Sequence, residues 1–212
     1  YQCDWSSDVC SSDLIDHINY YTSSTWAKNL LSQLSKSSNK THMFECLLGQ
    51  QKPHRDIVQQ LYTHSLFKDQ IIFTYFKQDL NSGMWDDKYN PHTLGHSLTG
   101  DLFLLNGEEA RISAMLPVDI YNRSYYSIVA ETTASNEYNQ YTEKVAKPIL
   151  AHRPFVAFCG QYYLRNLRDL GFKTFHPIID ESYDSVENIH LRFKLAWQQV
   201  ELLCQHDPEL IY

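Results

Sequence analysis

The sequence predicts an α/β domain of three layers, in which helices cover both faces of a mainly parallel sheet. Short apolar runs, typical of strands buried on both faces, alternate with helices that have one apolar stripe. The alternation is densest from Tyr141 to Phe175, where helix, strand, helix and strand follow one another in YTEKVAKPILAHRPFVAFCGQYYLRNLRDLGFKTF. A chain of 212 residues, 43% of them hydrophobic, is also long enough to bury such a core.

The first residues do not fit this pattern. Cys3 to Leu14, CDWSSDVCSSDL, resembles the translation of a common short-read sequencing adapter. We therefore expect residues 1–14 to be an artefact of a metagenomic read, dispensable and poorly packed, and the chain to be a fragment that lacks its native N-terminus. The alternative is a native, polar and disordered tail. Residues 15–40 contain a helix with one apolar face, followed by a polar break.

The first β-α-β unit places basic residues at the start of a helix. Met43–Leu48 and Gln70–Phe76 are predicted strands, and Lys52-Pro53-His54-Arg55-Asp56 opens the helix between them. Arg55 is either a phosphate contact or a solvated residue of the first turn. We interpret His54 as structural and keep it as a possible ligand contact.

The next segment, Gln78 to Glu109, is long, polar and poor in periodicity, so we expect a flexible loop near the active site. His92 and His96 are four residues apart, a spacing that lets two histidines on a helix bind a metal. Pro91 and Gly95 favour a loop instead, and we predict no metal site here.

A carboxylate follows the third predicted strand. Leu116–Asn122 is a predicted short helix, and Tyr125–Ala130 is a strand that runs into Glu131. The carboxyl end of a parallel strand is where ligands bind, but a carboxylate can equally cap the next turn. Both roles remain open for Glu131.

The helix after this strand begins with a candidate anion site. Thr142 is a good N-cap residue, and Glu143 suits the first turn. Lys144 and Lys147 follow within the same helix. A helix N-terminus with nearby lysines favours a ligand that carries phosphate.

The last part of the chain is predicted to be strand, helix, strand, loop and helix. Phe155–Cys159 is a buried strand, a helix ends at Gly171, and Phe172–Phe175 is the next strand. Carboxylates in the following loop are interpreted as solvated or capping groups, not as metal ligands; they are Asp180, Glu181 and Asp184. From Ser185 a terminal helix presents an apolar face of Leu191, Leu195, Val200 and Leu203, with Trp197 as its anchor.

With this order of elements, YSIVAETTASNEYNQYTEKVAKPILAHRPFVAFCG resembles the donor-binding half of GT-B glycosyltransferases. It is most similar to the alpha-1,3-fucosyltransferase family, in which a strand ending in Glu precedes a T-E-K helix and another buried strand. The span from Thr41 to Leu203 also resembles uncharacterised glycosyltransferase-like proteins of phages and marine bacteria. The resemblance implies a Rossmann-like C-terminal half of a GT-B fold. Residues 41–205 would be the donor domain, 15–40 a remnant of a truncated acceptor domain, and 206–212 a tail.

The resemblance also implies roles for residues. The T-E-K glutamate contacts the donor ribose and the lysine contacts its diphosphate, which assigns these roles to Glu143 and Lys144. An arginine after the first strand contacts the phosphates, and Arg55 occupies that place. Lys147 assists or is a solvated lysine, and Glu131 and Thr142 complete the predicted donor site. The implied enzyme uses a GDP- or UDP-sugar without a metal or other cofactor, because basic groups and a helix N-terminus stabilise the leaving diphosphate.

The chain departs from the family in three places. Ala151-His152-Arg153 stands where a small residue or Gly is usual, and Cys159-Gly160-Gln161 lacks the usual Gly/Pro-rich turn. The acceptor domain, which supplies the general base, is nearly absent. The sequence therefore assigns no sugar, glycan acceptor or catalytic base.

Composition excludes other classes. The net charge of −7 argues against a nucleic-acid surface, and no apolar run reaches membrane-spanning length. Scattered cysteines and no leader favour a cytoplasmic protein of a bacterial or phage-infected cell. Two alternatives remain open. One is another nucleotide-dependent transferase such as a methyltransferase, although LLGQQK has only one glycine. The other is an inactive glycan- or nucleotide-binding module.

Overall fold

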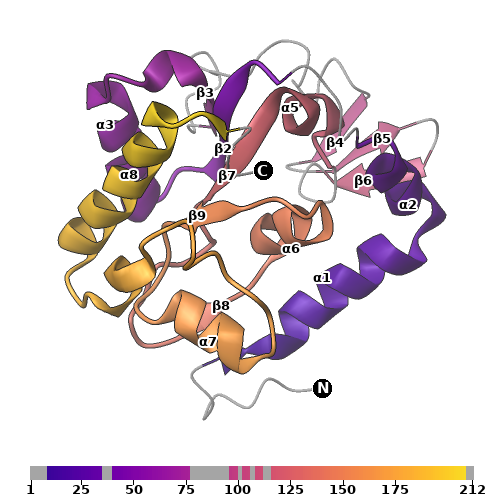
Figure 1. Cartoon of the computed structure of the whole chain (residues 1–212). Coiled ribbons are helices and arrows are strands. Elements are labelled where there is room, and N and C mark those ends of the chain that lie inside the picture. Colours follow the sequence, from indigo (N-terminus) through magenta and orange to yellow (C-terminus); the bar gives the residue numbers. More distant parts are fainter. Residues whose placement is uncertain are drawn as a thin grey trace.

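A computed structural model describes residues 9–34, 40–76, 96–99, 102–105, 108–111 and 116–208 (Figure 1). Its central sheet has four parallel strands in the order β3-β2-β7-β9. They are β2 (His42–Gln50), β3 (Ile71–Phe76), β7 (Ser124–Val129) and β9 (Phe155–Ala157). The predicted α/β class with a parallel, Rossmann-like sheet is confirmed.

Helices cover both faces of this sheet. α3 (Pro53–His64) and α8 (Ile189–Gln205) pack together on one face, while α6 (Glu143–Leu150) and α1 (Ser11–Ser23) pack together on the other (Figure 1). α5 (Val118–Arg123) leads directly into β7. The predicted three layers are therefore present.

The chain reverses its direction across the sheet between β2 and β7. From β2 it passes through α3 to β3 on one side, and it later returns to β7 on the other side of β2. In open parallel sheets such a switch point leaves a crevice beyond the carboxyl ends of the two central strands, and ligands bind there. The segments that follow β2 and β7 are the ones that carry Arg55 and Glu131.

The expectation of one loop over residues 78–109 is wrong where the structure describes them. β4 (His96–Thr99), β5 (Leu102–Leu105) and β6 (Glu108–Arg111) form a separate antiparallel sheet. The sequence does contain a signal for it, since Asn106-Gly107 is a hairpin dipeptide between two short runs. His92 lies outside the described residues, and His96 belongs to a strand, not to a helix or loop.

The N-terminal part also differs from the expectation. β1 (Val9–Cys10) pairs in parallel with β8 (Asn139–Gln140), a short strand between Glu131 and Thr142. Leu14, in the first helix, is fully buried in the core, so poor packing of residues 1–14 is wrong for this residue. The single helix expected in 15–40 is two, because α2 (Thr25–Ser32) follows a break at Ser24.

The strand expected at Phe172–Phe175 is absent from the described structure, and β9 is the last strand of the sheet. The N–H of Phe175 donates to Glu181 Oε1 at 2.7 Å instead of pairing with a strand. Its ring packs edge-on against Phe155, with centroids 5.1 Å apart. The end of this segment is thus held against the core by the Glu181 carboxylate and the Phe155 ring, not by pairing with a strand.

Local signals predicted the helix ends well. Gly171 has φ 92° just after α7 (Tyr163–Asp169), a conformation that suits glycine. The predicted start of the terminal helix at Ser185 is wrong: α8 begins at Ile189 behind the Asn188 cap, and Glu181–Ser185 is a separate 3₁₀ helix. Trp197 does anchor α8, with 3% exposure. Leu191 is the exception on the predicted apolar face, because it is 49% exposed.

Candidate functional site

The loop from β2 into α3 is tied to the end of β7 by two buried side chains. Arg55 Nη1 donates to the Gln50 carbonyl at 2.7 Å, and Nη2 donates to the Glu131 carbonyl at 3.1 Å. His54 Nε2 also bonds to the Glu131 carbonyl, at 2.9 Å. Burial lowers the pKa of Arg55, but a guanidinium stays protonated in proteins. Its charge therefore faces the ends of both central strands.

This geometry differs from the phosphate contact that the resemblance implies for Arg55. The side chain is only 3% exposed, and both terminal nitrogens already donate to backbone carbonyls. Its Nε is buried without a partner among the residues that the structure describes. Arg55 thus holds the switch point together. His54 adds a second side-chain bond to the same Glu131 carbonyl.

Glu131 is fully buried and accepts a hydrogen bond at each available position. Oε1 accepts from the Thr142 N–H at 2.9 Å and from the Tyr163 hydroxyl at 3.1 Å. Oε2 accepts from the Thr142 hydroxyl at 2.5 Å and from the Thr132 N–H at 3.1 Å. Burial raises the pKa of Glu131, while Lys144 and the Thr142 donors oppose the rise. Of the two roles left open, this geometry is that of a carboxylate that organises the next turn.

The start of α6 presents one lysine at the carboxyl edge. Thr142 caps the helix, since its hydroxyl accepts from the Lys144 N–H at 3.4 Å. Lys144 Nζ contacts Glu143 Oε1 at 2.6 Å and the hydroxyls of Thr132 and Thr142 at 3.2 and 3.3 Å. These oxygens fix the ammonium group in one place beside the end of β7.

Glu143 is not a free carboxylate. It pairs with Lys144, and its other oxygen lies 4.0 Å from His17 Nε2 on α1. Burial alone would raise the pKa of Glu143, but the ammonium groups of Lys144 and Lys147 outweigh it and lower the pKa. The Glu143 carboxylate is therefore ionised at neutral pH.

Lys147 lies one turn further along α6 and faces the sheet. Burial and the neighbouring Lys144 lower its pKa to about 8, against the opposing effect of Glu143 and Glu45. Its ammonium group has no hydrogen-bond or ion-pair partner in the described part of the chain. Glu45 is a buried carboxylate in β2.

Lys52 is a further cation beside Arg55 and Lys144, and the donor site predicted from the sequence does not include it. It is the N-cap residue of α3 and makes no side-chain cap. Burial lowers its pKa, and the positive charges of Arg55 and Lys144 lower it further. Ser, Thr, Asp and Asn are the usual N-cap residues, and a cation at that end opposes the helix dipole. A lysine directly before Pro53 was therefore a signal that the sequence already contained.

The acidic loop after α7 is used internally. Asp184 accepts from the N–H groups of Leu164 and Arg165, both at 2.9 Å. Glu181 pairs with Arg168 at 2.7 Å, and Asp180 caps the next turn by accepting from the Ser182 N–H at 2.9 Å. No cluster of His, Cys, Asp or Glu among the described residues is suited to hold a metal ion.

Two departures from the family pattern are accommodated by buried contacts. Arg153 donates to three backbone carbonyls and two serine hydroxyls around the start of β7, after a His152 with φ 53°. Gly160 lies so close to Ser135 that a Cβ would be 2.1 Å from its carbonyl oxygen. The turn after β9 therefore requires this single glycine.

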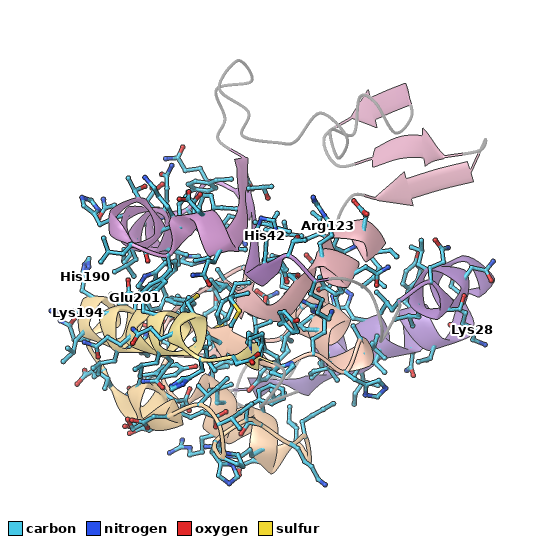
Figure 2. All side chains as sticks on the ribbon, turned by 45° about the horizontal axis from the view of Figure 1, so that its top comes forward. Lys28, His42, Arg123, His190, Lys194 and Glu201 are labelled. Carbon is cyan, nitrogen blue, oxygen red and sulfur yellow. The ribbon has the colours of Figure 1, made fainter. Side chains whose placement is uncertain are left out.

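Two surface grooves in the described part of the chain lie away from these residues. One groove runs between α3 and α8, with Ile57, Leu61 and Trp197 in its lining and His190, Lys194 and Glu201 along α8 (Figure 2). A second lies at the amino edge of the sheet and includes His42. None of the predicted site residues lines either one.

No protein family, curated protein or solved structure matches the chain. None of the helices in the described ranges combines the length and the apolar character that crossing a bilayer requires.

Proposed function

We propose that this chain is the donor-binding domain of a metal-independent, nucleotide-sugar-dependent glycosyltransferase. The observation that carries the proposal is the grouping of Lys52, Arg55 and Lys144 on two helix starts at the switch point of a parallel sheet. Such an edge suits a nucleoside diphosphate, because helix N-termini and fixed cations attract phosphate. The T-E-K resemblance narrows this general anion site to a sugar-nucleotide donor.

The proposed chemistry needs positive charge at the leaving group. When the glycosidic bond breaks, the nucleoside diphosphate gains negative charge. The Lys144 ammonium group, held in place by Thr132 and Thr142, is positioned to stabilise that charge. Glu143 would accept hydrogen bonds from the ribose hydroxyls. Glu131 would hold Thr142 in place, and with it the first turn of α6 that carries Glu143 and Lys144. The sugar, the acceptor and the general base are not assigned to residues of this chain.

A methyltransferase is the second candidate enzyme, and the β2–α3 turn argues against it. Dinucleotide-type loops need glycines so that the backbone can approach the ligand closely. Gly49 lies within β2, and the turn itself, Gln51-Lys52, contains no glycine. This favours recognition by side chains.

Ligand binding and sugar transfer test the proposal. We expect GDP or UDP to raise the melting temperature of the purified chain, and S-adenosylmethionine to leave it unchanged. A shift with S-adenosylmethionine alone would favour the methyltransferase. No shift with any nucleotide would favour an inert module. Sugar transfer is measured on the chain completed by its upstream reading frame, because we propose that the acceptor domain lies there. As a nucleotide-sugar enzyme, the protein is proposed to act in the cytoplasm of a bacterial or phage-infected cell.

A further inference from the structure

We infer that Lys52 binds the phosphates of the donor together with Lys144, and that Arg55 is a positioning residue which does not touch them. This inference rests on the proposed function and changes the assignment of its phosphate contacts. The inference follows from the partners that the protein itself provides for the three cations at the switch point, Lys52, Arg55 and Lys144.

Arg55 is engaged. Its terminal nitrogens donate to the carbonyls of Gln50 and Glu131, at the ends of the two central strands. A direct phosphate contact would require a side chain that is 3% exposed to break these bonds and leave two carbonyls unpaired. Arg55 therefore acts on the ligand only by holding the two loops in register.

Lys52 is available. It is partly exposed at the N-cap of α3, and its ammonium group has no hydrogen bond or ion pair among the described residues. The charged groups that act on it are Arg55 and Lys144, both positive, and no carboxylate is among them. The nearest acid in sequence, Asp56, instead accepts from the Tyr75 hydroxyl at 2.8 Å and from Gln51 at 3.3 Å.

Lys144 comes to the same place from the other side of the switch point. Lys52 precedes the helix that follows β2, and Lys144 lies in the first turn of the helix that follows β7. Lys144 already has a counter-charge in Glu143, at 2.6 Å, whereas no carboxylate acts on Lys52. A bound phosphate would give Lys52 its missing counter-charge and relieve its repulsion with Lys144. A diphosphate has two phosphoryl groups, one for each ammonium group.

The experiment compares Lys52→Gln with Lys68→Gln by calorimetric titration. Lys68 is exposed in the short η1 helix (Lys68–Gln70) before β3, at the opposite edge of the sheet, so both variants lose the same charge. The probes are GDP, UDP and inorganic pyrophosphate at several salt concentrations. We expect Lys52→Gln to weaken binding about tenfold or more, as for a lost charge-assisted contact, and Lys52→Arg to restore most of it. Lys68→Gln should bind like the wild type.

The salt dependence separates a phosphate contact from a structural role. Lys52→Gln should reduce the slope of affinity against salt concentration, because one ion pair is removed. Arg55→Met should lower the melting temperature but keep that slope. Wild-type affinity and slope in Lys52→Gln would overturn the inference while leaving the proposed function intact.

The failure of the proposed function has a different signature. If the wild type binds pyrophosphate but neither GDP nor UDP, the nucleotide-sugar role is wrong. Loss of pyrophosphate binding in Lys52→Gln would still support the Lys52–Lys144 site. If the wild type binds none of the probes, both are overturned.

Discussion

The starts of α7 and α3 show two opposite uses of charge at a helix N-terminus. At α7, the buried carboxylate of Asp184 accepts from two successive N–H groups. At α3, the N-cap residue is Lys52, which provides no acceptor. The first helix start is satisfied by the protein itself, while the second brings a cation to the place where the helix dipole already favours an anion.

The comparison separates charge that maintains the fold from charge that is available to a ligand. Around α7 the acids are matched to donors: Glu181 pairs with Arg168, and Asp184 caps the helix. At the start of α3, the Lys52 ammonium group has no hydrogen-bond or ion-pair partner in the described part of the chain. Counting charged residues would not distinguish these regions, since both are rich in them. Their hydrogen bonds do.

The largest effect is expected from Asp184→Ala, which tests the structural side of the comparison. The change leaves the Leu164 and Arg165 N–H groups without acceptors in a buried place. The free energy of unfolding should fall by about 3 kcal/mol, measured by urea denaturation. Asp180→Ala is the comparison, because that carboxylate is exposed and accepts only the Ser182 N–H, so it should lower the unfolding free energy by a smaller amount, about 1 kcal/mol. Equal effects of the two variants would contradict the assignment.

Glu131→Gln tests whether Glu131 belongs to the structural class. An amide keeps the shape of the side chain but turns an NH₂ group toward donors such as the Thr142 N–H or the Thr132 N–H. We expect a loss of about 2 kcal/mol in unfolding free energy, with nucleotide affinity reduced only as far as α6 is displaced. Unchanged stability together with lost nucleotide binding would instead make Glu131 a ligand contact.

Lys144→Ala tests the ligand side. Nucleoside diphosphate affinity should fall about tenfold, or roughly 1.4 kcal/mol, with the melting temperature nearly unchanged. Lys173→Ala, which removes an exposed lysine, is the matched control. Equal GDP and UDP affinities with and without Lys144 would show that the donor-site assignment is wrong.

The smallest effect concerns pH and Lys147. Its pKa in the folded chain is lowered to about 8, mainly by burial, whereas an unfolded lysine titrates near its ordinary pKa of about 10.4. The stability linked to this group is therefore present above the unfolded pKa and is lost as pH falls through the folded pKa. Relative to Lys147→Gln, the wild type should lose on the order of 1 kcal/mol between about pH 10 and pH 7. Denaturation curves across this range that run parallel would contradict a depressed pKa.

Local chemistry allowed much of the fold to be predicted from the sequence alone. Apolar runs predicted all strands of the parallel sheet, Thr142 and Gly171 predicted helix ends, and Trp197 predicted the packing of α8. These signals depend on residues near one another in the chain, so they need no knowledge of distant partners. The sequence also indicated that Arg55 would lie near Glu131, at the end of β7, because the carboxyl ends of parallel strands share an edge.

Only the tertiary structure decided which charged groups are already engaged. Arg55 and Lys52 lie three residues apart and look equivalent in the sequence, yet one is 3% exposed with two carbonyl partners and the other has none in the described residues. The Glu131 carboxylate receives its donors from Thr132, Thr142 and Tyr163, the last of them 32 positions away. Whether a charge is buried, paired or available depends on such long-range neighbours, and no local pattern encodes them.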